Sequence, residues 1–288
     1  MDHLKIDSLS KSFKRHRVLN QVSLEIKPGL FGLLGPNGAG KTTFMRIIAT
    51  ILRPDEGEIR FNGIDWSKNP DQVRKMLGYL PQDFGLFRNI TARESLEYIG
   101  SLKGIPKNHL YFEIKKVLEE VNLQEYENKK VGGFSGGMRR RLGIAQAILG
   151  EPQLIMVDEP TAGLDPEERI RFRNLLKRLG NQNRIVFLST HIVEDIQATC
   201  EQIAVLNKGK AQIFNSTSEL AKIAKDKVWK LTVNEEQFNE IEKNYKIISS
   251  NMTESGIDLR ILSNSKPNDD ALSVDPSVEE GYLTWIHQ

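Results

Sequence analysis

The chain has 288 residues, and because about 150 residues per domain is a useful prior, this length favours a large domain and a small one. Hydrophobic residues make up 39% and charged residues 27%, an ordinary globular composition that argues against disordered, collagen-like and coiled-coil proteins. The 40 basic and 38 acidic residues leave a net charge of only +2, so composition gives no reason to expect a nucleic-acid partner.

Apolar runs are short: Leu154–Val157 is typical, whereas a membrane-spanning helix needs about 20 residues. Met1–Lys5 has an acidic residue, Asp2, at its second position and no apolar h-region, so no secretory signal is readable. We therefore expect a cytoplasmic protein whose membrane role is peripheral. The single cysteine, Cys200, has no partner for a disulfide or a metal site and is expected to be a buried structural thiol.

Residues 4–26 alternate apolar and polar side chains, beginning with Leu4 and Ile6, and this pattern predicts antiparallel strands with one buried face. Leu30–Leu34 is a short apolar run next to glycines, as expected for a strand buried on both faces. A glycine-rich loop follows, and we expect a helix to begin at about Thr42.

Two further buried strands are predicted at Leu154–Val157 and Ile185–Leu188. Each is flanked by helical patterns, which is typical of parallel strands joined by crossovers. Residues 90–150 show apolar side chains at helical spacing, so we place a mostly helical insert at about 88–150. The core is therefore expected to be α/β, with the antiparallel strands as a separate β subdomain.

The end of the chain differs in charge: residues 220–288 hold 8 basic and 12 acidic residues, whereas residues 1–219 hold 32 and 26. A short helix at 219–224 is expected to lead into this tail. The predicted strands are 228–233, 246–250 and 257–262, with a helix at 234–243. We expect two domains, 1–219 and 220–288, of which the second is small and α+β.

A glycine-rich octet separates the strand at 30–34 from the helix after it. It reads Gly35, Pro36, Asn37, Gly38, Ala39, Gly40, Lys41 and Thr42, which fits G-x-x-x-x-G-K-[ST]. Glycines let backbone N–H groups wrap around phosphate oxygens, Lys41 adds positive charge, and Thr42 can offer its hydroxyl to Mg²⁺. With the adjoining Thr43, the octet predicts the nucleotide site of a P-loop NTPase core.

The strand at 154–157 ends in an acidic pair, Asp158 and Glu159. At the carboxyl end of a strand, Asp158 can hold Mg²⁺ while Glu159 polarises an attacking water as general base. The alternative is an acidic pair that caps a helix beginning near Pro160. The P-loop upstream favours the catalytic interpretation.

A Ser-Gly-Gly sequence precedes the predicted helix 139–149 and is a candidate for a second phosphate-binding helix start, although alone it is more often a helix cap. Its residues are Ser135, Gly136 and Gly137. With the P-loop and the acidic pair, it makes residues 2–219 resemble the ATP-binding cassette family. The usual L-S-G-G-Q signature is altered here at Phe134 and Met138.

The resemblance implies roles for four more residues, each with an ordinary structural alternative. Phe13 matches the aromatic residue that stacks on adenine, although an aromatic in a strand is usually core. Gln82 matches the glutamine that contacts Mg²⁺ and the water, in what would otherwise be a turn. Asp165 matches the loop that meets the opposite subunit, and it also precedes Pro166 as a helix cap. His191 matches the histidine that contacts the γ-phosphate, whereas a lone histidine is more often structural.

The resemblance further implies ATP and Mg²⁺ as cofactors and a dimer, formed with a second copy or a homologous ATPase subunit. In this family each P-loop faces the Ser-Gly-Gly element of the opposite subunit. ATP would close the dimer, and hydrolysis by Glu159 and His191 would release it.

Within the family, the sequences around Met138 and at 158–166 resemble bacterial exporter ATPases of the drug, ion and lantibiotic type. These act on a separate integral membrane permease, which implies a position on the inner face of the cell membrane. The segment Phe84–Phe87 would border the permease's docking groove, with Leu86 and Phe87 either partner contacts or core. The alternative is a soluble family member acting on nucleic acid or ribosomes, but a second cassette and a long coiled-coil array are lacking.

Overall fold

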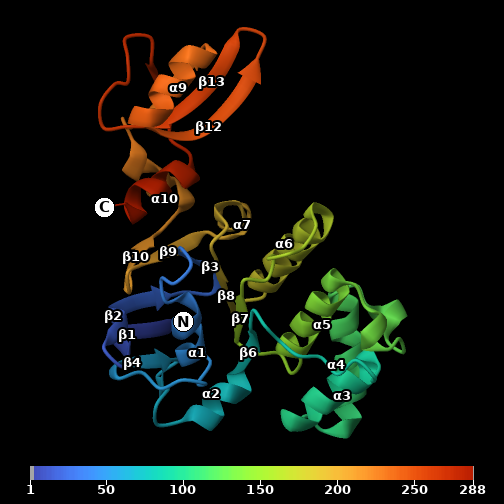
Figure 1. Ribbon diagram of the computed structural model, residues 1–288. Helices are drawn as coiled ribbons and strands as arrows, with labels where there is room; N and C mark the ends of the chain where they lie inside the picture. Colours follow the sequence, from blue (N-terminus) through green and yellow to red (C-terminus); the bar gives the residue numbers. More distant parts are fainter. Residues whose placement is uncertain (1–2, 288) are drawn as a thin grey trace. The chain divides into compact units, whose positions relative to one another are not determined.

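The computed structural model describes residues 3–287, and the chain divides into two compact units, Met1–Ile213 and Phe214–Gln288. Figure 1 shows the elements of both units. The predicted boundary between the two domains lies later, after residue 219. None of the helices described between residues 3 and 287 is long and apolar enough to cross a lipid bilayer.

An antiparallel sheet begins the first unit, with strand order β2-β1-β4-β5. Its strands are β1 (Leu4–Phe13), β2 (His16–Ile26), β4 (Glu56–Phe61) and β5 (Ile64–Asp65). In β1, side chains such as Leu4 and Ile6 are buried while Lys5 is exposed, as the sequence alternation predicts. Strands β4 and β5 were not predicted, and β4 pairs antiparallel with β1.

A six-stranded sheet forms the centre of the unit, in the order β10-β9-β3-β8-β7-β6. Its strands are β3 (Gly29–Leu34), β6 (Leu77–Leu80), β7 (Leu154–Asp158), β8 (Ile185–Thr190), β9 (Gln202–Asn207) and β10 (Lys210–Phe214). The pairs β3–β8, β3–β9, β7–β8 and β6–β7 are parallel. The parallel sheet predicted from the apolar runs is confirmed, and the carboxyl ends of β3, β7 and β8 therefore lie at one edge.

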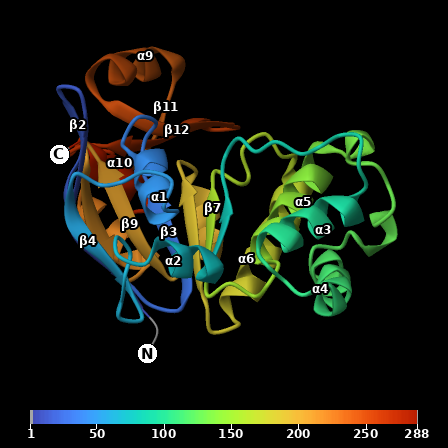
Figure 2. The ribbon, with the colours of Figure 1, turned by 90° about the horizontal axis from the view of Figure 1, so that it is seen from below.

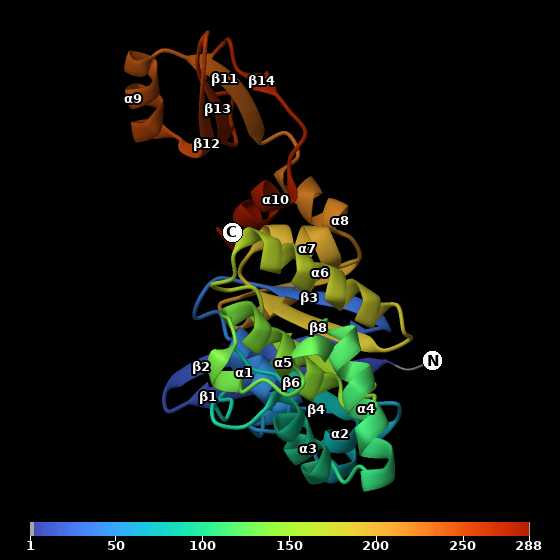
Figure 3. The same ribbon diagram turned by 90° about the vertical axis from the view of Figure 1, so that its right-hand side faces the viewer.

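Helices cover this sheet on both faces. The helices described in this unit, on the sheet or beside it, are α1 (Lys41–Ile48), α2 (Pro70–Met76), α3 (Ala92–Leu102), α4 (Lys107–Glu120), α5 (Gly136–Ile148), α6 (Pro166–Gly180) and α7 (Val193–Thr199). Figure 3 shows α6 and α7 on one side of β3 and β8, with α1 and the antiparallel strands on the other. Figure 2 shows α3, α4 and α5 gathered beside the sheet, so residues 88–150 form a helical group next to β6 and β7.

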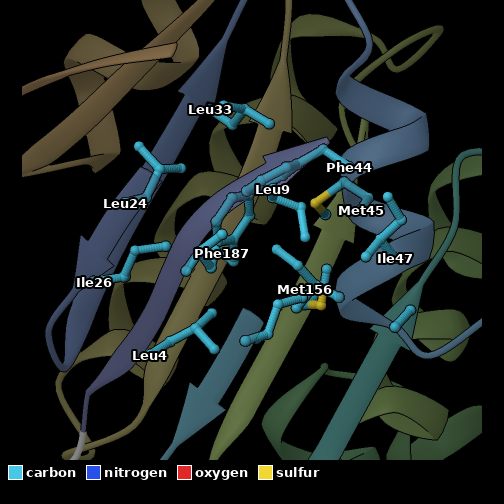
Figure 4. Packing of buried hydrophobic residues seen from close by; sticks show 14 of the residues in the cluster. Leu4, Leu9, Leu24, Ile26, Leu33, Phe44, Met45, Ile47, Met156 and Phe187 are labelled. Carbon is cyan, nitrogen blue, oxygen red and sulfur yellow. The ribbon is translucent and has the colours of Figure 1, made fainter. Parts of the chain in front are cut away.

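The main core lies between the antiparallel strands, α1 and the six-stranded sheet (Figure 4). Phe44 and Met45 of α1 and Phe187 of β8 are completely buried there. Phe31 stacks on Phe187 with ring centroids 5.2 Å apart, which fixes β3 against β8. Strand β3, which leads into the P-loop, is therefore held in place by packing on both of its faces.

Up to residue 287 the second unit contains a sheet in the order β12-β13-β11-β14, three α-helices and a short 3-10 helix (Lys222–Ala224), and α9 packs on β12 and β13. Its elements are α8 (Thr217–Ala221), β11 (Val228–Val233), α9 (Glu235–Asn244), β12 (Lys246–Thr253), β13 (Gly256–Leu262), β14 (Leu272–Ser273) and α10 (Val278–Ile286). The three predicted strands and the predicted helix are present, while β14 and α10 were not predicted.

A buried ion pair ties α10 to β13 in this unit. Arg260 donates from Nε to Oε1 of Glu280 at 2.7 Å and from Nη2 to Oε2 at 2.9 Å. Burial pushes the pKa of Glu280 upward, but the bonds from Arg260 and from the Ser277 N–H outweigh it and hold that pKa below 4.5. A carboxyl with a depressed pKa stabilises the fold above its unfolded pKa and loses that contribution as pH falls through the folded pKa.

We therefore expect Glu280→Gln to lower the free energy of unfolding by about 2 kcal/mol at pH 7, less than for a fully buried pair because Arg260 is about one-third exposed. The difference from the wild type should shrink as pH falls below 4.5. Urea denaturation followed by circular dichroism at pH 7 and pH 4 measures both. Glu279→Gln, at the exposed neighbouring position, is the control, and an equal loss in both variants would contradict the expectation.

Candidate functional site

The P-loop joins the end of β3 to the start of α1. Gly38 has a φ of 81° and Gly40 a φ of 106°, values that favour glycine. A Cβ added at Gly40 would lie 3.0 Å from the Val18 carbonyl oxygen of β2, so the loop and the antiparallel sheet are in close contact. The glycines of the octet thus permit both the turn and the close approach.

Lys41 is buried at the floor of the loop and only 6% exposed. Its Nζ donates to the carbonyl oxygens of Gly35 at 2.7 Å and Pro36 at 3.3 Å. Nζ also lies 3.4 Å from Oε1 of Glu159. A buried ammonium is therefore held by main-chain oxygens and a carboxylate at the point where phosphate groups would compete for it.

Glu159 follows β7 and is 4% exposed. Its φ of 48° is unusual for a residue with a side chain and costs about 1–3 kcal/mol, which the surrounding structure must offset. One such contact is the bond from its N–H to the Ser189 carbonyl at 2.8 Å. This backbone turns the carboxylate toward the histidine after β8.

His191 contacts the same carboxylate, with Nδ1 2.9 Å from Oε2 of Glu159. In the tautomer with its proton on Nδ1, His191 donates this hydrogen bond to the carboxylate. The Thr190 hydroxyl also donates to Oε2, at 3.4 Å. The structure therefore places Lys41, Glu159 and His191 in one continuous chain of contacts.

Asp158 is the last residue of β7 and is completely buried. Among residues 3–287, neither of its carboxylate oxygens meets a hydrogen-bond donor at bonding geometry. Burial raises the pKa of Asp158, and the nearby hydroxyls of Ser189 and Thr42 offset that only in part. A buried carboxylate without a full set of donors is a place where a cation would be stabilised.

A cavity of about 260 Å³ opens over Lys41, Glu159 and His191, and Asp158 is outside its described lining. It is lined by Val18, Pro36, Asn37, Gly38, Gly40, Lys41, Thr42, Thr43, Gln82, Glu159 and His191. The structure thus brings most of the predicted P-loop residues together with Gln82 after β6, Glu159 after β7 and His191 after β8. The volume falls just below the roughly 300–1,000 Å³ of ordinary ligand pockets.

Other predicted residues lie elsewhere. Phe13 ends β1, is 47% exposed and has the Lys11 ammonium 5.7 Å from its ring centroid. Asp165 caps α6 by accepting the N–H of Glu168 at 2.9 Å, so its structural interpretation is confirmed. Among the described residues, neither Phe13 nor Asp165 lines the P-loop cavity of its own chain.

The Ser-Gly-Gly element begins α5. The Ser135 hydroxyl accepts the N–H of Met138 at 3.1 Å, a helix cap. Ser135 and Gly136 are exposed, and a Cβ added at Gly136 would meet open space. Phe134, which replaces the usual leucine, is buried and contacts Tyr126 edge to face. This element also lies outside the described lining of the P-loop cavity.

Sequence reasoning missed Asp195 of α7, a completely buried carboxylate. It accepts a hydrogen bond from the Thr161 hydroxyl, three residues after Asp158, and one from Nε of Arg173 at 2.7 Å. Asp195 therefore ties the turn after β7 to α6 and α7. The available signal was an acidic residue on the helical face that also carries Ile196 and Thr199, because a carboxylate on a buried face needs cationic or hydroxyl partners.

Comparisons with known proteins bear on these residues. Residues 19–162 match the model of the family described as ABC transporter. The Bacitracin transport ATP-binding protein BcrA of Bacillus licheniformis is 36% identical over 72% of this chain and 67% of its own. The Linearmycin resistance ATP-binding protein LnrL of Bacillus subtilis is 31% identical over 80% of this chain and 75% of its own.

Solved structures agree with the fold. One is a dimeric ATP-binding cassette in a post-hydrolysis state, bound to ADP and phosphate, with 26% identity and a TM-score of 0.66. It covers 74% of this chain, which covers 98% of that structure. The predicted α/β P-loop fold with its antiparallel subdomain is confirmed.

Proposed function

The chain belongs to the ABC transporter family, and from that premise we propose that it is the ATP-hydrolysing subunit of an exporter, dimerising on ATP to drive a separate membrane permease. The observation that carries the proposal is the set of contacts joining Lys41, Glu159 and His191 in the P-loop cavity. Export is supported by the relatives named for bacitracin transport and linearmycin resistance. The accessory role of residues 220–288 and the position at the inner membrane face belong to the same proposal.

In this proposal each residue of the cavity has one task. The octet's N–H groups and Lys41 bind the phosphates, and Glu159 accepts the proton of the attacking water. His191, which contacts Glu159 through Nδ1, orients that carboxylate and borders the γ-phosphate. Phe13 would stack on adenine from the end of β1, and Asp165 would meet the opposite subunit.

The residues present also fit Mg²⁺. The buried Asp158 carboxylate lacks donors at bonding geometry among residues 3–287, and it lies beside Thr42 at the end of the P-loop. We propose that Asp158, Thr42 and Gln82 hold the ion, whose chemistry is to neutralise charge on the phosphates.

Dimerisation would complete the site. Ser135 and Gly136 are exposed and sterically open, and they do not line the cavity of their own chain among the residues described. The cavity is also small for a whole nucleotide. Both observations support a site in which Ser135, Gly136 and Gly137 of a second subunit close over the γ-phosphate.

An exposed aromatic pair supports docking of a permease. Phe87 is 62% exposed and packs edge to face on Tyr98 of α3, which is 50% exposed. Leu86, for which partner contact and core were both open, is half-buried and lines a groove with Gln82. A partner helix could cover the two aromatic rings without disturbing the ATP cavity.

We expect Glu159→Gln, tagged and purified with ATP from detergent-solubilised native membranes, to carry a stoichiometric polytopic membrane protein. Adding Phe87→Asp should lower the amount of that membrane protein in the eluate at least tenfold, because the aspartate charge would be buried against an apolar surface of the partner. Mass spectrometry of the eluate measures both results.

Ile51→Asp is the matched control, since Ile51 is equally exposed at 63% but follows α1. Ribosomal proteins or nucleic acid in the eluate would instead favour the soluble alternative. An unchanged yield with Phe87→Asp would contradict the proposed docking surface.

A further inference from the structure

One arginine of α5 reaches across to two other loops. Arg140 lies five residues after Ser135, and its Nη1 donates to the Gln82 carbonyl oxygen at 3.0 Å. Its Nη2 donates to the carbonyl oxygens of Glu159 and Ala162, each at 3.4 Å. A single guanidinium therefore connects α5, which presents the Ser-Gly-Gly element, to the loop after β6 and to the turn after β7.

These hydrogen bonds of Arg140 hold the two loops in position, and none of them pairs the guanidinium with a carboxylate. All three acceptors are main-chain carbonyls, and the guanidinium lies 5.6 Å from the centroid of the Phe84 ring. Burial lowers the pKa of Arg140, with Asp83 opposing it, yet an arginine stays protonated in proteins. The planar fork suits this task, because its separated donors can bond two loops at the same time.

The two loops that Arg140 contacts carry Gln82 and Glu159, both of which line the P-loop cavity. The backbone of Glu159 is in the left-handed region and must be held there. Its N–H is held by the Ser189 carbonyl at 2.8 Å, whereas among residues 3–287 its carbonyl accepts only longer bonds, from Arg140 and from the Ala162 N–H, both at 3.4 Å. The carbonyl side of this turn thus depends on α5.

We infer that Arg140 is a positioning residue that sets the Glu159 turn and the Gln82 loop against the helix carrying Ser135. The inference rests on the proposed function, in which Glu159 is the general base. A movement of α5 changes the placement of the Glu159 backbone through this side chain. Closure of Ser135 on a second subunit's nucleotide is in this way linked to readiness for hydrolysis.

We expect Arg140→Met, which retains an apolar stem and removes the donors, to lower kcat by about 10- to 100-fold, because displacements near 1 Å have effects of this size. The Kd for ATP should change less than about twofold, since Arg140 is absent from the described lining of the P-loop cavity. Arg140→Lys should give an intermediate kcat, because an ammonium is a point donor and cannot bond both loops.

Arg178→Met is the matched control. Arg178 of α6 is exposed and donates to a main-chain carbonyl of the helical insert, that of Glu120 at 3.3 Å, without contacting the turn after β7. It should leave kcat within about twofold. Equal losses in Arg140→Met and Arg178→Met, or a loss of ATP affinity and melting temperature that parallels the loss of kcat, would overturn the inference.

A double-mutant cycle on the full-length chain tests whether Arg140 acts through Glu159. Single-turnover rates are measured for Arg140→Met, Glu159→Gln and the double variant. If the inference holds, Arg140→Met slows the Glu159→Gln protein by less than about threefold, because the base it positions is already absent. Independent, multiplicative losses would overturn the inference. Near-normal hydrolysis by Glu159→Gln alone would instead overturn the proposed role of Glu159.

Discussion

Glu159→Gln is expected to slow ATP hydrolysis by about 100- to 1,000-fold while ATP still binds, because general base catalysis contributes an effect of this order. The amide occupies nearly the same volume in this buried position, so the turn after β7 should stay folded. Without hydrolysis, ATP should hold two chains together through Ser135. Phosphate release measures the rate, and light scattering with and without ATP measures the mass.

The dimer is tested further on the Glu159→Gln background. Ser135→Asp keeps an N-cap for α5, which Ser135 now provides to the Met138 N–H, but it puts a carboxylate against the γ-phosphate. Ser135→Asn keeps the cap without the charge. We expect ATP-dependent dimers with asparagine and monomers with aspartate. Dimers in both, or a monomeric Glu159→Gln protein in ATP, would contradict closure through this residue.

The parts of the fold that could be predicted are those whose signal is local. Strands β3, β7 and β8 are fully or almost fully buried over most of their length, so each is a short apolar run between turn residues. The glycines of the octet mark the turn into α1 in the same way. The residues of each of these segments are enough to predict its structure, without knowledge of the segments that pack against it.

Strand β9 was missed although Ile203–Leu206 is a short buried apolar run, whereas two other missed strands depend on distant partners. In β4 only Ile59 and Phe61 are buried, and the strand pairs with β1, whose residues lie about 50 positions earlier. Strand β6 has four residues and lies between α2 and Pro81. Strand tendency of this kind comes from packing against neighbouring strands, which a single sequence does not display.

In the candidate site, too, some residues could be predicted from the sequence and some contacts could not. Lys41 and Glu159 belong to motifs in which residue type and spacing carry the chemistry, so they could be named in advance, whereas His191 was named only from the resemblance to the family. The contacts of Arg140 could not be named in advance, because its acceptors are main-chain carbonyls, which every residue has. The contact between Lys41 and Glu159 likewise depends on the order of β3 and β7 across the sheet.

Lys41→Met is expected to weaken ATP binding by at least about 100-fold, which corresponds to about 2.8 kcal/mol, because the phosphates lose their buried ammonium. It should also lower the free energy of unfolding by about 3 kcal/mol. The substitution leaves the Glu159 carboxylate buried without the cation 3.4 Å away, and breaking a buried pair costs about 3–5 kcal/mol. The lower value applies because Thr190 and His191 still contact the carboxylate.

The two losses have different causes, and the double variant Lys41→Met with Glu159→Gln separates them. A neutral amide no longer needs the ammonium, so the double variant should regain most of the stability that Lys41→Met loses. ATP affinity should not recover, since the phosphates still lack a cation. Urea denaturation and fluorescent-nucleotide titration measure the two quantities on the same proteins. If the double variant is no more stable than Lys41→Met, the ion pair does not set the stability of this site; if it regains ATP affinity, the ammonium acts only by neutralising Glu159.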